Sequence, residues 1–291
     1  MPCTTHNSDS CPCTHSTPRT GSLPFHPIDL CQPDDLKSCA ACCGLYNWQD
    51  HSRAALTEII TLQTDLFMQL DSYDNLDTYR DLRNSRLNNT KLFETIYNCE
   101  FIGFIDPARL RVGCLLHPSV TGNHKLRNHC FYGSKICHEH FCPSYGCLTT
   151  SEQQAVVTAL QDWYLYGLVI TDIDLVKEFF RHVENTIGES VKPARLSNAT
   201  LQATLLDFFT LKEHWPFKAA ENRLGKYYFS ESEYVIARIE YRTRWGVPDS
   251  VWDKILVSLE SNFNSLEQIR EAEHILQEKV ESFIQAYMQT E

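Results

Sequence analysis

The stretch Cys39-Ala40-Ala41-Cys42-Cys43 says more about the fold than any other part of the sequence. With a lone Cys99 and a later cluster, it accounts for nine of the 13 cysteines. The later cluster consists of Cys114, Cys130, Cys137, Cys142 and Cys147. Packing alone gives no reason for such clustering, because a free cysteine packs only as a small apolar residue. Thiolates bind zinc and the iron of iron–sulfur clusters, so the nine cysteines predict a metal centre.

Composition favours metal over disulfides. The count of 13 cysteines is odd, and residues 1–30 contain no apolar segment behind a basic start that would indicate a secretory signal. A chain of 291 residues can bury an adequate core without covalent cross-links. We therefore expect reduced thiols and a cytoplasmic location.

Charge and hydropathy exclude two classes of partner. The net charge of −11 leaves no broad basic surface, so we expect no nucleic acid to bind. The longest apolar run, residues 163–170, is far too short to span a bilayer, so we expect no membrane insertion. Residues 103–148 differ locally, because five Lys or Arg against two acidic residues give +3. Such cations would offset the negative charge of clustered thiolates.

The sequence divides into three regions, which together predict a mainly α fold. Residues 1–30 are rich in Ser, Thr and Pro and read as a disordered tail. Residues 31–150 predict a loop-rich cysteine-cluster module that binds metal. In this module we expect a helix over residues 51–70 behind an Asp50 N-cap, and shorter helices over residues 78–87 and 90–97. A small hairpin over residues 101–116 should carry Cys114.

Residues 151–291 contain no cysteine and predict an all-α bundle. Apparent capping boxes begin at Ser151, Ser230 and Asn264, and Pro248 precedes another expected helix. Apolar residues between Leu266 and Ile284 give the last helix one continuous buried face. This half is the expected site for a protein partner.

The cysteine spacing indicates more than one ordinary zinc site. Cys39 and Cys42 can close on one ion, but the adjacent Cys43 leaves the backbone in another direction. Four ligands saturate a structural zinc, so nine cysteines imply two sites, or one site with additional structural thiols. The adjacent cysteines, the surplus of thiols and the five nearby cations favour an iron–sulfur cluster, and zinc is the alternative.

The order of these motifs resembles the YkgJ-type cysteine-cluster proteins, which are described as chelating zinc or iron and are related to flagellin lysine methylases. The resemblance rests on residues 39–44, Cys99, residues 112–118 and the Arg127-x-x-Cys130 step. It covers residues 31–150 and leaves the helical half unassigned. Leu36 stands where the first cysteine of a full CxxCxxCC motif would fall, and Cys31 is the candidate to replace it.

Three functions follow as hypotheses. The first is an iron–sulfur protein with a redox or accessory role. The second is a structural zinc module that presents the helical half to a partner. The third, a metal-dependent protein methyltransferase, is implied by the family resemblance alone. The sequence contains no motif for a methyl-donor cofactor, so whether the chain is an enzyme stays open.

Overall fold

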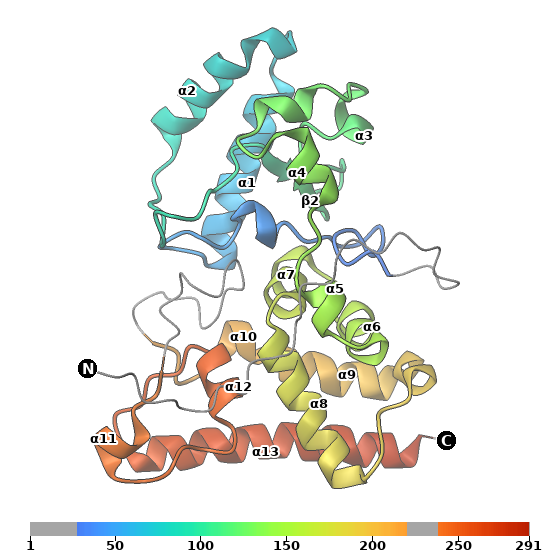
Figure 1. Ribbon diagram of the computed structural model, residues 1–291, viewed down its shortest axis with the longest axis vertical. Coiled ribbons are helices and arrows are strands. Elements are labelled where there is room, and N and C mark those ends of the chain that lie inside the picture. The colour runs from blue at the N-terminus through green and yellow to red at the C-terminus, as the bar shows by residue number, and fades with distance from the viewer. Residues whose placement is uncertain (1–27, 220–237, 291) are drawn as a thin grey trace, which may run out of the picture.

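The computed structural model describes residues 28–219 and 238–290 and confirms the predicted mainly helical fold. A loop-rich part with short helices lies above a helical part, whose base is the long helix α13 (Leu266–Gln289) (Figure 1). Residues 1–27 of the predicted tail lie outside the described residues, whereas Leu30 is buried in the core. None of the described helices is long and apolar enough to cross a membrane.

The upper part is built on one helix and a hairpin. Its elements are η1 (Ala41–Cys43), α1 (Arg53–Met68), η2 (Tyr73–Asn75), α2 (Leu76–Arg86), β1 (Ile102–Phe104), β2 (Val112–Cys114), α3 (Pro118–Thr121), η3 (Leu126–His129) and α4 (Gly133–Glu139). The short helix α5 (Ser144–Cys147) follows beside α6 (Thr150–Ala159) and packs against the lower core through Tyr145 and Cys147. The predicted hairpin is confirmed, and Ile102 pairs with Cys114 in its antiparallel register. Helix α1 supports it directly, because Gln63 Nε2 donates to the carbonyl of Ile102 at 2.7 Å.

The predicted N-cap of α1 was misplaced by two residues. Ser52, not Asp50, caps the helix, and its hydroxyl accepts from the amide of Ala55. The Asp50 carboxylate instead accepts from the amide of Ser52 at 3.0 Å, so it orders the turn that leads into the helix. The amphipathic pattern therefore located the helix, while the cap depended on the local backbone conformation.

The predicted helix over residues 90–97 does not form. The buried side chain of Asn47 accepts from the amide of Phe93 at 2.8 Å and donates to the carbonyls of Phe93 and Ile96 at 2.9 and 3.1 Å. Lys91 also pairs with Trp48 in an isolated bridge. Backbone groups that a helix would pair internally are thus bound by a distant side chain.

The lower part is the predicted helical bundle. Its elements are α6 (Thr150–Ala159), α7 (Trp163–Ile170), α8 (Ile173–Ile187), η4 (Pro193–Ser197), α9 (Ala199–Phe209), α10 (Leu211–His214), α11 (Tyr241–Trp245), α12 (Asp253–Ser258) and α13. The first capping box is formed by Thr149 and Glu152, because the hydroxyl of the predicted cap Ser151 bonds the carbonyl of Val191 instead. Ser265, rather than Asn264, caps α13. The predicted box at Ser230 lies outside the described residues.

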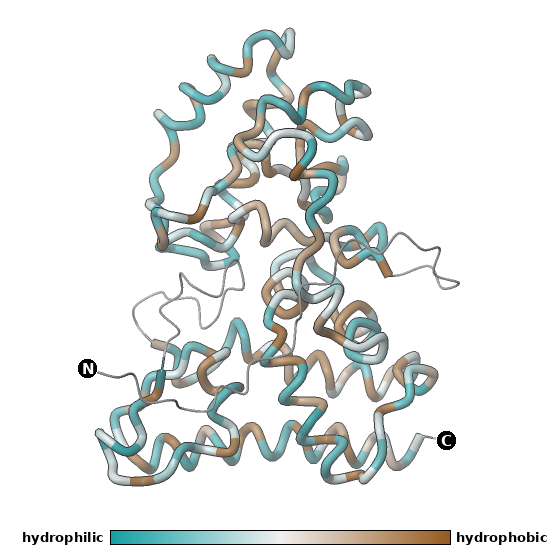
Figure 2. Tube along the Cα trace, viewed as in Figure 1, coloured by the Kyte–Doolittle hydropathy of each residue, from teal (hydrophilic) through white to brown (hydrophobic). Residues whose placement is uncertain are grey.

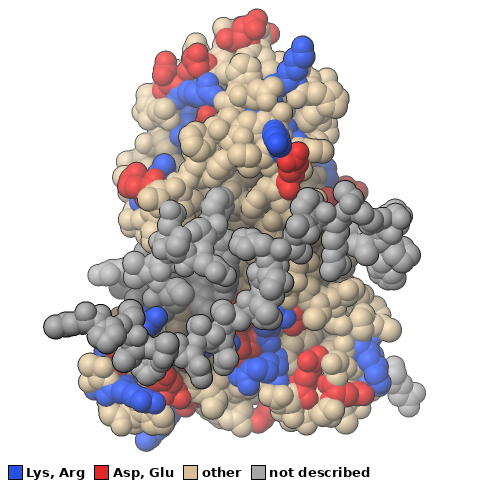
Figure 3. All heavy atoms as spheres, in the orientation of Figure 1, with Lys and Arg blue, Asp and Glu red and all other residues tan. Residues whose placement is uncertain are grey.

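Hydrophilic and charged side chains lie on the surface of both parts. Helix α2 is largely hydrophilic (Figure 2), and only Leu76, Tyr79 and Arg83 of its residues are buried. On the face drawn in Figure 3, acidic and basic side chains are interspersed at both ends of the molecule.

Helix α7 is buried along its whole length and belongs to both cores. One side of it packs into the upper core through Trp163, Tyr164 and Leu168. Its other side packs into the lower core through Leu165, Tyr166, Val169 and Ile170. A helix that is apolar all round is stable only when it is enclosed, so each part of the molecule completes the burial of α7.

A close contact fixes the upper part to α7. Tyr46, three residues after Cys43, is buried, and its hydroxyl donates to the carbonyl of Tyr164 at 2.9 Å. The tyrosine reaches the helix backbone because Gly167 has no side chain. A Cβ built at Gly167 would lie 2.1 Å from the Tyr46 oxygen and 3.0 Å from its ring carbon Cζ.

We predict that Gly167→Ala destabilises the protein although alanine is the better helix former. The added methyl group forces Tyr46 away from α7, and overpacking of this kind costs about 1–3 kcal/mol. Urea unfolding followed by circular dichroism measures the loss. Gly146→Ala is the matched control, because no atom lies within 4 Å of a Cβ built there. Equal stability of Gly167→Ala and the parent would contradict the proposed constraint.

Candidate metal centre

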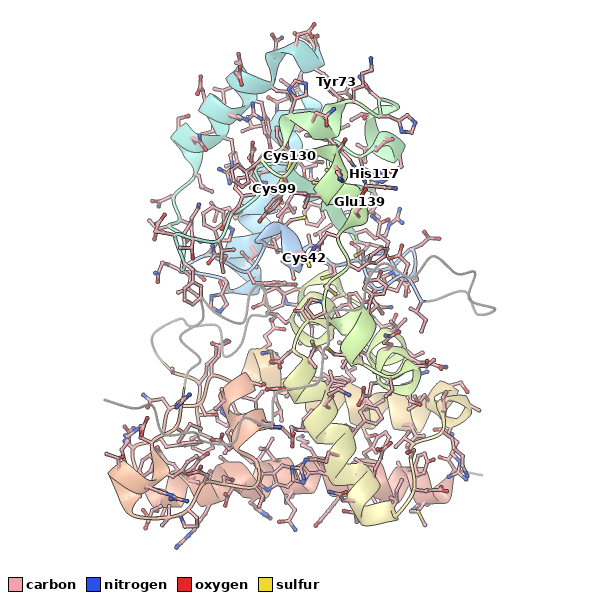
Figure 4. All side chains as sticks on the ribbon, in the orientation of Figure 1. Cys42, Tyr73, Cys99, His117, Cys130 and Glu139 are labelled. Atoms are coloured by element: carbon pink, nitrogen blue, oxygen red, sulfur yellow. The ribbon has the colours of Figure 1, made fainter. Side chains whose placement is uncertain are left out.

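The structure brings nine free thiols into two neighbouring groups. The first, called here the hairpin thiol group, lies around the end of the β-hairpin and consists of Cys43, Cys99, Cys114, Cys130 and Cys137. The second, called the junction thiol group, lies nearer to α7 and consists of Cys31, Cys39, Cys42 and Cys142. Figure 4 shows Cys99 and Cys130 beside each other, with Cys42 below them.

Cys130 is the centre of the hairpin thiol group. Its sulfur lies 3.9 Å from the sulfur of Cys99 and 3.8 Å from that of Cys137. Cys130 begins the turn into α4, and Cys137 follows on that helix. Cys99 is held next to the C-x-x-C-C turn, because its amide donates to the carbonyl of Cys43 at 2.9 Å.

Cys43 and Cys114 belong to the same group because the charge of one thiol acts on the pKa of the other. Burial raises the pKa of Cys43 to about 12, and negative charge on Cys114 and Cys130 adds to this effect. Arg127 is the nearby cation: its charge lowers the pKa of Cys43, and it also hydrogen-bonds the sulfur of Cys114. Its Nε is buried and has no hydrogen-bond partner among the described residues. A fixed guanidinium here favours ionised thiols.

Backbone amides point at the sulfurs in a repeated pattern. The amide of Ala41 donates to the sulfur of Cys39 at 3.4 Å, and for five of the free thiols the amide two residues further along the chain lowers the pKa of the sulfur. The pairs are Cys39 with Ala41, Cys99 with Phe101, Cys114 with Leu116, Cys130 with Tyr132 and Cys142 with Ser144. Donors to sulfur stabilise the thiolate and orient it, which is what partners outside the ligand set do at metal centres. The repetition indicates loops shaped to present thiolates.

The junction thiol group is assembled from three separate segments. The amide of Cys39 donates to the carbonyl of Cys31 at 2.8 Å, which closes the loop that contains the exposed Leu36. Cys42 hydrogen-bonds Cys142 from the segment before α5. The hydroxyl of Tyr145 lies 3.8 Å from the sulfur of Cys31. Cys31 therefore occupies a place near Cys39 although its spacing from Cys39 is not that of a CxxC pair.

Two of the thiols have a lowered pKa, whereas the pKa of the rest is raised. Hydrogen bonds from Cys137 and Cys99 lower the pKa of Cys130, and a hydrogen bond from Cys42 lowers the pKa of Cys142. Burial and neighbouring thiolates raise the pKa of the others; for Cys31 it rises to about 11. In each group, therefore, one thiol has a lowered pKa and is the one whose ionisation the neighbouring thiols favour. A bound cation would replace the thiol protons.

One predicted ligand, Cys147, does not join the free thiols. Cys147 is disulfide-bonded and belongs to neither group of free thiols. Of the histidines near the second cluster, His117 uses Nδ1 to accept from the amide of Ser119 and so caps α3. In the described ranges no set of three or more His, Cys, Asp or Glu side chains already encloses a position for an ion. The thiols are neighbours, but their sulfurs do not yet converge on one point.

Sequence reasoning found the cysteines but not their partition. No sequence pattern indicated that backbone amides would point at the sulfurs. The position of Arg127 beside Cys43 and Cys114 was indicated only by the Arg127-x-x-Cys130 spacing. Cys31 was recognisable only as a replacement for the cysteine missing at Leu36. These features depend on how loops far apart in the sequence meet.

Comparisons with known proteins add nothing further to the assignment. No family model matches the chain, no curated protein is similar to it, and no solved structure matches its fold.

Proposed function

We propose that this chain is a zinc-binding protein and that Cys43, Cys99, Cys130 and Cys137 hold one ion. The observation that carries the proposal is the spacing of the sulfurs around Cys130, at 3.9 and 3.8 Å. Zinc–sulfur bonds of about 2.3 Å in a tetrahedron place neighbouring sulfurs roughly 3.8 Å apart. Both measured distances equal an edge of that tetrahedron. Cys43 and Cys99 would have to close in on Cys130 and Cys137 to complete it.

The same spacing distinguishes a single ion from an iron–sulfur cluster, which the cysteine count favoured. In a four-iron cluster each thiolate binds a different iron atom, and in a two-iron cluster only two thiolates share one iron. A sulfur with two neighbours at the edge length, as Cys130 has, therefore fits one ion better than either kind of cluster. Two sulfur pairs at the tetrahedral edge length therefore support zinc. Cys114 then remains outside the ligand set, with Arg127 as its hydrogen-bond partner.

The junction thiol group has the chemistry for a second ion. Cys31, Cys39, Cys42 and Cys142 supply four thiols, and two of them, Cys39 and Cys142, accept backbone amides. Since Cys42 and Cys43 are adjacent but belong to different groups, one turn would hold both ions. This arrangement follows from η1, a 3-10 helix in which successive side chains point about 120° apart.

The proposed role of the ions is structural. Few regular elements order the chain between β2 and α6, where the helices are four to seven residues long. Thiolate–zinc bonds would cross-link these loops to the C-x-x-C-C turn, which Tyr46 in turn attaches to α7. The ions would thereby hold the upper part in place on the helical part. We propose that the helical part is the surface presented to a protein partner.

The convergence of the cysteines also supports a relation to the YkgJ-type proteins. Residues that carry the resemblance are brought together, because Cys39, Cys42, Cys43, Cys99, Cys114 and Cys130 all lie within the two thiol groups. The proposal takes only the metal centre from that family. Methyl transfer is not part of it.

We predict two zinc ions per chain after anaerobic purification, with no labile sulfide and no visible absorption. Cys130→Ser should lose the ion of the hairpin thiol group, because it removes the thiolate that the other sulfurs surround. Elemental analysis of zinc and iron, with a sulfide assay, measures both results. Cys114→Ser is the matched control in the same group and should retain both ions.

Each site has its own readout in this experiment. Cys31→Ser should lower the zinc content by the ion of the junction thiol group alone. A brown protein with iron and labile sulfide would show that the sequence-based preference for a cluster was right and the zinc proposal wrong. Zinc content unchanged in Cys130→Ser would likewise contradict it.

We further predict that chelation under reducing conditions unfolds the upper part selectively. Its loops lose their cross-links, whereas the helical part keeps its own core. Limited proteolysis should then cleave between residues 117 and 147 while residues 151–219 stay protected, and near-ultraviolet circular dichroism should fall. Added zinc should reverse both changes. An unaltered cleavage pattern after complete zinc removal would show that the ions are not structural.

A further inference from the structure

A pocket of about 420 Å³ lies between α2 and the segments that carry Cys99 and Cys130. Its volume is within the range of sites for small organic molecules. Arg83 and Lys91 line one part of it, and Tyr97 and Phe131 line another. The pocket is distinct from both thiol groups, although its walls flank two of their cysteines.

Arg83 is a buried cation without a counter-ion. Its side chain is 7% exposed, and its Nε has no hydrogen-bond partner. One terminal nitrogen donates to Asn84 at 2.9 Å, and the other reaches Gln63 only at 3.5 Å. Burial lowers the pKa of this guanidinium, and no ion pair to it occurs in the described ranges. A buried charge is costly unless an opposite charge meets it.

The one carboxylate in the pocket is already matched. Glu100 accepts from Arg80 Nε at 2.9 Å and from the hydroxyl of Tyr97. Arg80 also binds Asp77 and the carbonyl of His129, so each of its three nitrogens already has a partner. Positive charge in excess of this pair comes from Arg83 and Lys91. The pocket therefore attracts an anion.

An exposed aromatic ring borders the same pocket. Phe131 is 76% exposed, which is unusual for a phenylalanine. Its ring is held by Tyr97 and Tyr132, with ring centroids 4.9 and 5.5 Å apart. A ring fixed in this way offers a flat apolar face on which a planar group can stack.

We propose that this pocket binds a small organic oxyanion, a phosphate or a carboxylate, attached to a planar group. The oxyanion would pair with Arg83, whose planar guanidinium matches both kinds of group, and with Lys91. The planar group would lie on Phe131. Because Asn98 and Glu100 flank Cys99 in the sequence, the bound ligand would lie directly beside the hairpin thiol group. No cysteine of the described ranges lines the pocket, so the proposed ligand contacts do not depend on which metal the thiols hold.

The test is calorimetric titration of the full chain with phenyl phosphate, benzoate and inorganic phosphate. We expect saturable binding of at least one aryl anion, about tenfold tighter than binding of inorganic phosphate. Comparison of phenyl phosphate with benzoate distinguishes a phosphate from a carboxylate ligand. Phe131→Ala should lower the affinity for the aryl anion to that for inorganic phosphate.

The arginine is tested with a matched pair on α2. Arg83→Gln should weaken binding by about tenfold or more, since a charge-assisted hydrogen bond is lost. Arg86→Gln removes an exposed arginine of the same helix and should leave binding unchanged. Lys91→Gln, at a partly exposed position, gives a second test if Arg83→Gln does not fold. Absence of saturable binding to either aryl anion, or equal affinity in the parent and in the folded Arg83 or Lys91 variant, would overturn the proposal.

Discussion

The burial of α7 between two hydrophobic cores is the constraint on which the rest of the molecule depends. Every residue from Trp163 to Ile170 is buried, so the helix is stable only when both parts of the chain enclose it. Tyr46 anchors the C-x-x-C-C turn to the carbonyl of Tyr164, and it comes that close because Gly167 has no side chain. On the opposite side, Tyr166 donates to the carbonyl of Leu30 at 2.9 Å and so holds the residue before Cys31. The apolar helix thus positions the segments that carry thiols.

Hydrogen bonds within the thiol groups show how the protein tolerates so many buried sulfurs. Thiols are weak donors, and a buried thiolate needs compensating partners. Neighbouring thiols and backbone amides lower the pKa of Cys130 and Cys142, whereas burial raises the pKa of thiols such as Cys43. If metal replaces the thiol protons, binding releases them, and metal affinity falls as the pH is lowered. The arrangement is a thiol network that one cation per group could convert into a cross-link.

The cationic pocket and the hairpin thiol group share segments of the chain. Residues 97–100 contribute both Cys99 and one wall of the pocket, and residues 129–131 contribute both Cys130 and Phe131. An ion that fixes these cysteines would also fix the walls. Ligand affinity and metal occupancy are therefore expected to be linked, since anything that orders one site lowers the entropy cost of ordering the other.

The sequence by itself determined the features that depend on local pattern. These are the helix around residues 53–68, the hairpin that carries Cys114, the helical second half and the unusual number of thiols. Tertiary structure decided the remainder. The side chain of Asn47 prevented a helix over residues 90–97, and the carbonyl of Val191 took the hydroxyl of the expected cap Ser151. Partition of the cysteines into two groups, with Cys42 in one and Cys43 in the other, required loops as far apart in the sequence as those of Cys31 and Cys142 to meet. Periodicity records which residues share a face of one element, but it carries no information on which distant loop packs against that face.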